Sequence, residues 1–147
     1  MPHNKKLFKQ VRCICILTME YRHARNKVFL VNYHLIWCPK RRKKVLVGGI
    51  KTRLEQIVYD VAREKGIDIL AFEVMPDHVH LFVSAYPDIS IHRIVKFFKG
   101  RSSNLLRKEF PELLKLPTMW THSYFASTAG AVSSETIQKY IEAQSKQ

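Results

Sequence analysis

Two histidines interrupt the apolar stretch MPDHVHLFV, which spans residues 75–83. Successive side chains of a β-strand point to opposite faces of a sheet, so a strand here would put His78 and His80 on one face. Two neighbouring imidazoles on a rigid strand are well placed to hold one metal ion. Burying the two imidazoles without polar partners would cost free energy. The alternative to a metal site is therefore a hydrogen-bonded histidine pair on a half-exposed strand. The pattern therefore indicates either a metal site or a structural pair.

A second candidate pair lies near the C-terminal end, in the stretch YIEAQ. Tyr140 and Gln144 have i,i+4 spacing, so a helix would place both on one face, one turn apart. A tyrosine beside a metal-bound phosphodiester can attack phosphorus and stay covalently joined to a DNA end, with the metal as Lewis acid. A free phenol, with a pKa of about 10, is a weak nucleophile at neutral pH. The alternatives are packing for Tyr140 and a solvated surface position for Gln144.

The elements that must carry these residues follow from hydrophobic periodicity. β-Branched and aromatic residues mark the segments that we expect to be strands: 27–37, 67–75, 78–85 and 120–128. Apolar residues at helical spacing and capping residues mark the expected helices: 49–66, 88–110 and 132–144. The order β-α-β-β-α-β-α predicts an α+β fold, a ferredoxin-like (split β-α-β) antiparallel sheet with an extra C-terminal helix that carries Tyr140. RNA-recognition modules share this arrangement, so the fold alone does not decide the function.

Pro76 and Asp77 supply turn residues between two expected strands, which must then form an antiparallel hairpin. Asp77 could also orient the imidazole of His78, as carboxylates do beside metal-binding histidines. We expect Asp77 mainly to serve the turn.

The charge of the chain is strongly basic. Lys and Arg number 25 against 12 Asp and Glu, a net charge of +13 over 147 residues. This balance points to a polyanionic partner, either nucleic acid or an acidic membrane surface. Five consecutive basic residues run from Lys40 to Lys44 and either contact phosphates or form a solvated loop. No apolar run approaches the roughly 20 residues that span a bilayer, so we expect no membrane span and a cytoplasmic location.

The length and composition predict one domain with its own core, since 46% of the residues are hydrophobic. The cysteines are odd in number and lack CxxC spacing, which argues against a disulfide framework or a structural zinc site: Cys13, Cys15 and Cys38.

Taken together, MPDHVHLFV and YIEAQ resemble the motifs of the single-tyrosine HUH transposases, small enzymes of bacterial and archaeal insertion sequences. The resemblance runs from about Tyr21 to Gln144 and includes NYHLIWCPKRRKKVL, FFKGRSS, FPELL and the STAG turn. It implies a DNA transposase that cuts and rejoins single-stranded DNA at the ends of an insertion sequence.

The resemblance also implies a role for four residues. His78 and His80 match the HUH metal ligands, and Gln144 matches the third protein ligand. Tyr140 matches the catalytic tyrosine, which forms a 5′-phosphotyrosine and leaves a free 3′-OH. The implied cofactor is a divalent metal, magnesium or manganese. A mixed imidazole and amide ligand set suggests that manganese binds more tightly than magnesium.

The implied partners are single-stranded DNA with hairpins near the element ends and a second copy of the chain. In such a homodimer the tyrosine helix can complete the partner's active site, and Gly130 is a candidate hinge. We expect contacts with the DNA backbone at six basic residues: Lys40, Arg41, Arg42, Lys96, Lys99 and Arg101.

The resemblance leaves out the first residues of the chain. We expect a single transposase domain at 19–147, preceded by a leader at 1–18 that is either an upstream read-in or a real extension. Two other functions stay open. A non-catalytic nucleic-acid-binding module would stack bases on aromatic residues such as Tyr33, Trp37 and Phe82. A domesticated relative would use the same chemistry on chromosomal repeats.

Overall fold

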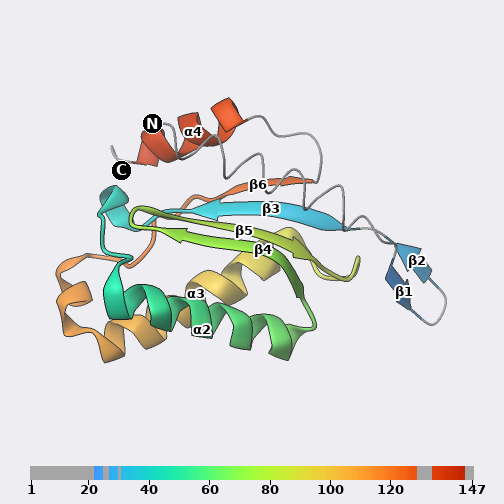
Figure 1. Ribbon diagram of the computed structural model, residues 1–147, viewed down its shortest axis with the longest axis horizontal. Coiled ribbons are helices and arrows are strands. Elements are labelled where there is room, and N and C mark those ends of the chain that lie inside the picture. Colours follow the sequence, from blue (N-terminus) through green and yellow to red (C-terminus); the bar gives the residue numbers. More distant parts are fainter. Residues whose placement is uncertain (1–21, 25–26, 30, 129–133, 145–147) are drawn as a thin grey trace.

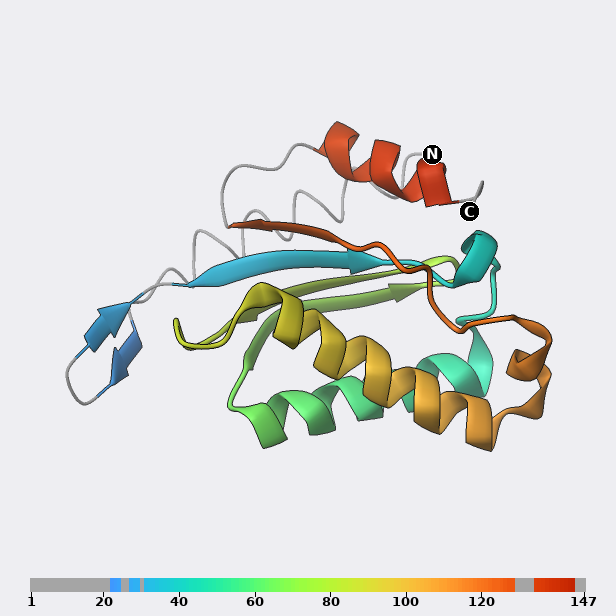
Figure 2. The same ribbon diagram turned by 180° about the vertical axis from the view of Figure 1, so that it is seen from behind.

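The structure is a computed structural model that describes residues 22–24, 27–29, 31–128 and 134–144. A four-stranded sheet carries helices α2 and α3 on one face and helix α4 on the other (Figure 1). The reverse view shows the same layers, with α2 and α3 packed together beneath the sheet (Figure 2). The elements in chain order are β1 (Arg22–Ala24), β2 (Lys27–Phe29), β3 (Asn32–Trp37), the 3-10 turn η1 (Lys40–Arg42), α2 (Gly48–Lys65), β4 (Asp68–Met75), β5 (His78–Ser84), α3 (Ile91–Glu109), the 3-10 turn η2 (Pro111–Lys115), β6 (Phe125–Thr128) and α4 (Ser134–Ala143).

The strands of the main sheet lie in the order β4-β5-β3-β6, and each neighbouring pair is antiparallel. Strands β4 and β5 form the hairpin that the turn residues predict. Helix α2 connects β3 to β4, and helix α3 connects β5 to β6. This order is the ferredoxin-like split β-α-β arrangement, so the predicted α+β fold with an additional C-terminal helix is confirmed.

The segment predicted as one strand at 27–37 is two strands. β2 pairs with β1 in a separate two-stranded sheet, whereas β3 pairs with β5 and β6. The prediction of a continuous strand was wrong because the two parts take their backbone hydrogen-bond partners from different neighbours. Side-chain alternation, which is the signal in the sequence, does not report those partners.

The strand predicted at 120–128 begins only at Phe125. Before it, the ammonium group of Lys99 donates to the carbonyl oxygens of Thr121 at 2.6 Å and Ser123 at 3.1 Å. A side chain therefore takes carbonyl groups that a neighbouring strand would otherwise use. The longer strand was a wrong prediction because this competing donor comes from a helix distant in sequence.

The ends of the two long helices follow the sequence signals. Helix α2 ends at Gly66, which has the left-handed φ of 66° that glycine adopts without strain. Helix α3 begins after Ser90, whose hydroxyl oxygen accepts a hydrogen bond from the backbone N–H of Arg93 at 3.3 Å. Gly100 lies inside α3 without interrupting it.

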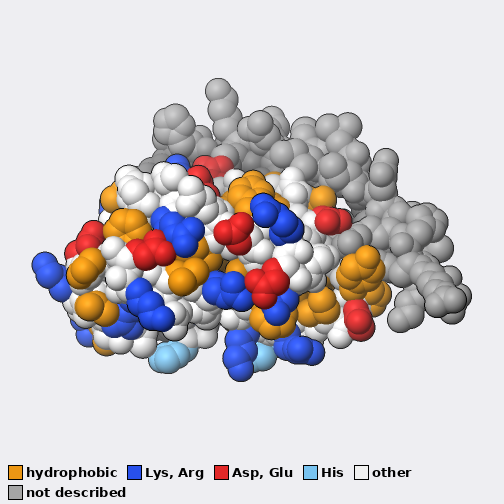
Figure 3. Space-filling model, turned by 90° about the horizontal axis from the view of Figure 1, so that it is seen from below, with side chains coloured by type: hydrophobic (Ala, Val, Ile, Leu, Met, Phe, Trp, Pro, Cys, Tyr) orange, Lys and Arg blue, Asp and Glu red, His pale blue; other side chains and the backbone are white. Residues whose placement is uncertain are grey.

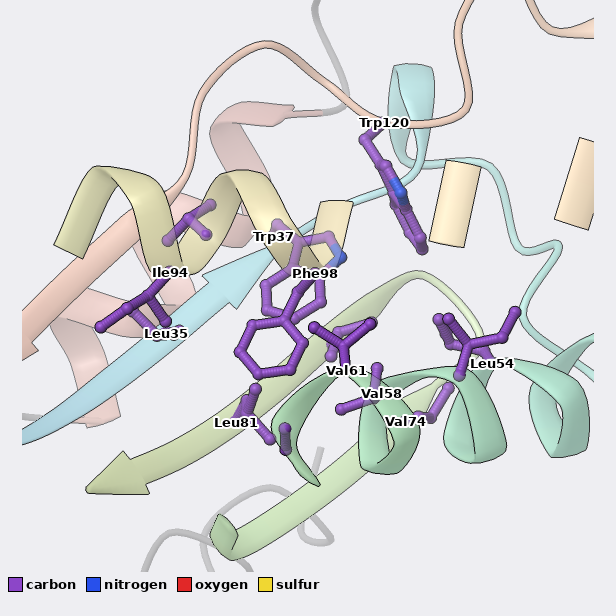
Figure 4. Close-up of a cluster of buried hydrophobic side chains, with 14 of the residues drawn as sticks. Leu35, Trp37, Leu54, Val58, Val61, Val74, Leu81, Ile94, Phe98 and Trp120 are labelled. Carbon is purple, nitrogen blue, oxygen red and sulfur yellow. The ribbon is translucent and has the colours of Figure 1, made fainter. Parts of the chain in front are cut away.

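The main core lies between the sheet and helices α2 and α3 (Figure 4). The ring of Trp37 stacks on Phe98 with centroids 6.3 Å apart and meets Trp120 edge-on at 6.1 Å. The β5 residues that face this core are the apolar half of the alternating pattern: Val79, Leu81 and Val83. The polar half of β5 therefore faces α4.

Basic and acidic side chains alternate over the outer face of α2 and α3 (Figure 3). Arg53 pairs with Glu109 at 2.7 Å, and Arg101 pairs with Glu64 at 3.1 Å. Part of the basic excess is thus matched by carboxylates on this face. No helix in the part of the chain that the structure describes is long and apolar enough to cross a membrane.

Replacing Phe98 with alanine is expected to lower the free energy of unfolding by about 3–5 kcal/mol, because the ring is completely buried and its loss leaves a cavity. Urea unfolding followed by circular dichroism measures this change. The matched control is Gly100→Ala in the same helix, where the added Cβ meets nothing within 4 Å. It should raise the free energy of unfolding by about 0.5–1 kcal/mol. A loss below about 1 kcal/mol for Phe98→Ala would contradict the assigned core.

Candidate active site

The two histidines lie on β5 and face the side of the sheet that α4 covers. His80 is opposite Ile36 of β3 in the strand register, and His78 is opposite Met75 of β4. His78 is 5% exposed and His80 3% exposed, so the strand is not half-exposed at these positions, as the alternative of a structural pair assumed. The prediction that both histidines share one face is confirmed. Burial at this level requires a partner for each ring.

His78 has such a partner in the residue before it. The Nδ1 atom of His78 lies 2.8 Å from Oδ1 of Asp77, and Oδ2 of Asp77 accepts a hydrogen bond from Nε of Arg42 at 2.7 Å. Hydrogen bonding to His78, together with the bond from Arg42, holds the pKa of Asp77 well below its ordinary value. Asp77 thus contacts the imidazole besides forming the turn, and the expectation that it mainly serves the turn was wrong.

His80 pairs with a third histidine that the motif did not include. Nε2 of His80 lies 3.3 Å from Nδ1 of His34, and the His34 ring stacks on Phe82 with centroids 4.4 Å apart. Burial lowers the pKa of His80 to about 3 and that of His34 to about 4, so both rings are neutral near pH 7. A neutral imidazole keeps the lone pair that binds a metal. The alternation of β3 was visible in the sequence, but its register with β5 was not.

Tyr140 and Gln144 meet on one hydroxyl group, that of Ser123. Oγ of Ser123 donates to Oε1 of Gln144 at 2.8 Å and lies 3.3 Å from the phenolic oxygen of Tyr140. The serine has one proton, which Gln144 receives, so the Tyr140 hydroxyl is the donor in the second bond. Gln144 also donates from Nε2 to the carbonyl oxygen of Tyr140 at 3.2 Å. The predicted pairing of Tyr140 with Gln144 on one helix face is confirmed, and Ser123 is the residue that sequence reasoning missed.

Helix α4 rests on the strand that lies beside the histidines. Ile141 is buried against Ile36 and Cys38, and the Tyr140 ring packs against Phe125 at 5.8 Å. Because Ile36 is opposite His80 in the register, helix α4 with Tyr140 and the histidine pair of β5 lie on the same face of the sheet. Burial raises the pKa of Tyr140 to about 12, and hydrogen bonding between the phenolate form and neighbouring hydroxyl groups offsets part of this rise. The phenol therefore stays protonated near neutral pH.

The donor set decides how a metal could be held. Among the described residues, no group of three or more His, Cys, Asp and Glu side chains is placed to hold a metal ion. Two imidazoles alone are too few for the coordination that divalent metals prefer. A metal between His78 and His80 would need another kind of ligand, and the carboxamide oxygen of Gln144 on the same sheet face is chemically suited to this role. Gln144 is only 3% exposed.

The basic loop after β3 divides into two kinds of residue. Lys40 and Arg41 form no ion pair within the part of the chain that the structure describes, and Arg41 is exposed. Arg42, by contrast, is paired with Asp77. Of the three predicted DNA-contact residues on this loop, Lys40 and Arg41 are therefore the two that could contact an external anion without loss of a described ion pair.

The other predicted DNA-contact residues lie on α3. Lys96 is exposed, whereas Lys99 is half-buried and donates to two main-chain carbonyls. Arg101 is paired with Glu64 of α2. Lys99 and Arg101 thus have protein partners of their own. The predicted hinge, Gly130, and the leader at 1–18 lie outside the described residues.

The comparison with known proteins gives the family. A family model described as IS200-like transposase matches residues 27–144. The chain belongs to this transposase family. It is 40% identical over 132 residues to the ISDra2 transposase TnpA of Deinococcus radiodurans, a match that covers 88% of this chain and 94% of that protein. It is 28% identical over 115 residues to the transposase for insertion sequence element IS200 of Salmonella typhimurium, covering 76% and 75% of the two chains.

The crystal structure of a suspected transposase from Deinococcus radiodurans R1 agrees in fold, with a TM-score of 0.79 and 37% identity. The match covers 84% of the present transposase and 97% of that chain. The family predicted from the sequence is confirmed, and the transposase is an enzyme. The family match does not support the alternative of a non-catalytic module. Of its three named aromatic residues, Trp37 is completely buried and Phe82 is 1% exposed, so neither can stack bases, whereas Tyr33 is half-buried.

Lys99 gives the transposase a testable pH dependence. Burial lowers the pKa of Lys99 from 10.5 to about 8. The unfolded chain keeps this proton to higher pH, so the contribution of Lys99 to the free energy of unfolding should rise from about pH 8 towards pH 10.5. Urea unfolding of wild type and Lys99→Met across this range isolates the effect. Wild type should gain on the order of 1 kcal/mol over the variant, since partial exposure reduces the full effect. A constant difference between the two proteins would contradict the shift.

Proposed function

We propose that this transposase cleaves and rejoins single-stranded DNA at the ends of an insertion sequence through a covalent intermediate on Tyr140. The observation that carries the proposal is the meeting of Tyr140 and Gln144 on the hydroxyl group of Ser123, on the sheet face that holds His78 and His80. Two relatives are transposases named for insertion sequences, which supports the substrate. The single-stranded form of the DNA follows from the family resemblance of the motifs.

In the cleavage step the phenolic oxygen of Tyr140 attacks the scissile phosphorus while the bond from phosphorus to the 3′-oxygen breaks. The products are a 5′-phosphotyrosine and a free 3′-OH, so the phenol loses one proton and the leaving oxygen gains one. The Tyr140 hydroxyl donates to Ser123, which is therefore the first acceptor along the path of this proton. The burial that raises the pKa of Tyr140 keeps the phenol neutral until attack.

Rejoining is the reverse displacement with a different 3′-hydroxyl. The 3′-oxygen attacks the phosphotyrosine, the bond from phosphorus to Tyr140 breaks, and the phenol recovers its proton. One phosphate ester replaces another, so the energy of the cleaved bond is conserved and no nucleotide cofactor is required.

We propose that a divalent metal, magnesium or manganese, is held by His78, His80 and Gln144. Both ligand types fit, since burial keeps His80 neutral and the Gln144 carboxamide supplies an oxygen. When bound, the metal supplies Lewis-acid stabilisation of the charge that develops on the phosphoryl oxygens. The imidazole nitrogens favour manganese over magnesium, which prefers oxygen ligands.

The proposed partners are single-stranded DNA with hairpins near the element ends and a second copy of the chain. In the homodimer, α4 of one subunit would complete the site of the other. In the structure α4 packs on its own sheet, through Ile141 against Ile36 and Cys38. If α4 instead packed on the sheet of the partner subunit, Ile141 would make the same apolar contact there, so α4 would need no second apolar face.

The nucleophile is tested by Tyr140→Phe on a denaturing gel with labelled single-stranded DNA from the element's own end. Wild type should form a protein–DNA adduct only when manganese is present. The variant should form none, because it lacks the attacking oxygen, and its activity should fall by more than about a thousandfold. Its DNA affinity should stay within about twofold, since the ring remains. An adduct of undiminished yield in Tyr140→Phe would rule out this nucleophile.

We propose that the loop at Lys40 and Arg41 contacts the DNA backbone. Arg41→Gln should weaken binding of every single-stranded sequence tested and reduce the slope of log affinity against log salt by about 0.7. Fluorescence anisotropy at several salt concentrations measures both quantities. Lys96→Gln makes the same charge change on α3 and serves as the comparison. An equal loss of slope in Lys96→Gln would extend the surface to α3, and a loss for one sequence alone would contradict backbone contact.

A further inference from the structure

Arg42, Asp77 and His78 form a continuous hydrogen-bonded chain from the basic loop to the histidine pair. Nε of Arg42 lies 2.7 Å from Oδ2 of Asp77, and Oδ1 of Asp77 lies 2.8 Å from Nδ1 of His78. Arg42 and His78 thus contact different oxygens of the Asp77 carboxylate. The side chains become less exposed along the chain, from 28% for Arg42 to 13% for Asp77 and 6% for His78.

This arrangement decides which nitrogen of His78 carries the proton. A carboxylate can only accept hydrogen bonds, so Nδ1 of His78 must be the donor in the contact with Asp77. A neutral His78 then has its lone pair on Nε2. The guanidinium of Arg42 fixes the other oxygen of the carboxylate, so the plane of the Asp77 carboxylate is set from the loop side.

The backbone around Arg42 has an unusual conformation. Arg41 has a φ of 56° and Arg42 a φ of 52°, both in the left-handed region that residues other than glycine seldom adopt. Such conformations persist where the surroundings over-determine them. The backbone N–H of Arg42 donates to the carbonyl of Pro39 at 2.8 Å, and that of Leu46 donates to the carbonyl of Pro76 at 3.1 Å. The loop is thus tied to the turn that precedes His78.

We propose that Arg42 is a positioning residue that acts through Asp77 to hold His78 in the tautomer with an unprotonated Nε2. The inference rests on the proposed function in one respect, since it takes His78 as a ligand of the metal. Arg42 is then an internal support of the metal site, whereas its neighbours Lys40 and Arg41 are left to contact DNA. This differs from the role in DNA binding that the sequence suggests for all three.

The first test needs no metal and no activity. Nitrogen-15 NMR of the full-length protein, labelled at histidine, reports which ring nitrogen of His78 carries the proton. Wild type should show the Nδ1-protonated form, and Arg42→Gln and Asp77→Asn should show a mixture of both tautomers. The control is Arg53→Gln, which breaks an ion pair of the same 2.7 Å length on the helical face. A wild-type His78 protonated on Nε2, or an unchanged tautomer in Arg42→Gln, overturns the inference.

The second test measures manganese affinity by calorimetry on the same proteins. Arg42→Gln and Asp77→Asn should each weaken binding by about tenfold, the lower end of what loss of a supporting partner costs a metal-binding histidine. Arg53→Gln should stay within about twofold of wild type. The double variant should lose little more than either single variant, because both substitutions act through one imidazole. Arg42→Lys retains the charge but not the geometry and should fall in between.

The outcomes separate the two proposals. If wild type binds manganese and Arg42→Gln binds it equally well, the positioning role is overturned while the metal site stands. If wild type binds no manganese, the metal site fails, and the tautomer measurement still decides the role of Arg42. Thermal unfolding of each variant identifies a loss that comes from misfolding. In that event Arg42→Lys, with the charge retained, gives the deciding comparison.

Discussion

The pairing of β3 with β5 on one side and β6 on the other is the constraint on which the site depends. This register places Ile36 opposite both His80 and Phe125, and so fixes where α4 can rest relative to the histidines. A shift of one residue would point the two histidines into the core under α2 and α3 and turn the apolar residues of β5 towards the face that carries α4. The register is therefore enforced by hydrophobic burial on the far face: Val79, Leu81 and Val83. The core residues thus determine the geometry of the polar face without contacting it.

Burial has opposite consequences for the acids and bases of this face. It lowers the pKa of His80 to about 3 and raises that of Tyr140 to about 12, since the neutral form is favoured in both cases. Near neutral pH the imidazoles of His34 and His80 are neutral and the Tyr140 phenol is protonated. The protein alone therefore supplies little charge for phosphoryl transfer. A bound cation and the DNA phosphate would bring the missing charges, so such a site would become reactive only when both are present.

The sequence predicted the fold and the shared faces of the candidate residues better than it predicted the contacts that support them. Alternation and turn chemistry predicted the hairpin and the shared face of His78 and His80, because those properties depend on neighbours in sequence. The Ser123 contact and the His34 contact depend on register and on a loop that leaves the sheet, neither of which periodicity encodes. The same limit explains the overlong strands. A pattern of side chains predicts which face is buried, whereas the backbone partner depends on the tertiary fold.

The loop that follows β3 contacts both the His78 side and the Tyr140 side of the candidate site. The basic residues from Lys40 to Lys44 therefore belong to a loop with a structural role as well as a positive charge. On one side, Arg42 reaches Asp77 beside the histidines. On the other, the backbone N–H of Lys40 donates to the carbonyl of Met119 at 3.0 Å, and Pro39 forms a bridge with Trp120.

That second contact continues to Ser123, which lies beside Tyr140. The indole N–H of Trp120 donates to the carbonyl of Lys99 at 3.2 Å and to Ser102 at 3.1 Å, and the Lys99 ammonium in turn holds the carbonyls of Thr121 and Ser123. Each of these contacts involves a buried or half-buried donor, so none can be lost without leaving a polar group unsatisfied. The separation between the His78 side and the Tyr140 side is therefore determined by the loop as well as by the sheet. The same loop carries Lys40 and Arg41. An anion bound to these two residues would therefore contact the loop that helps to set the distance between His78 and Tyr140.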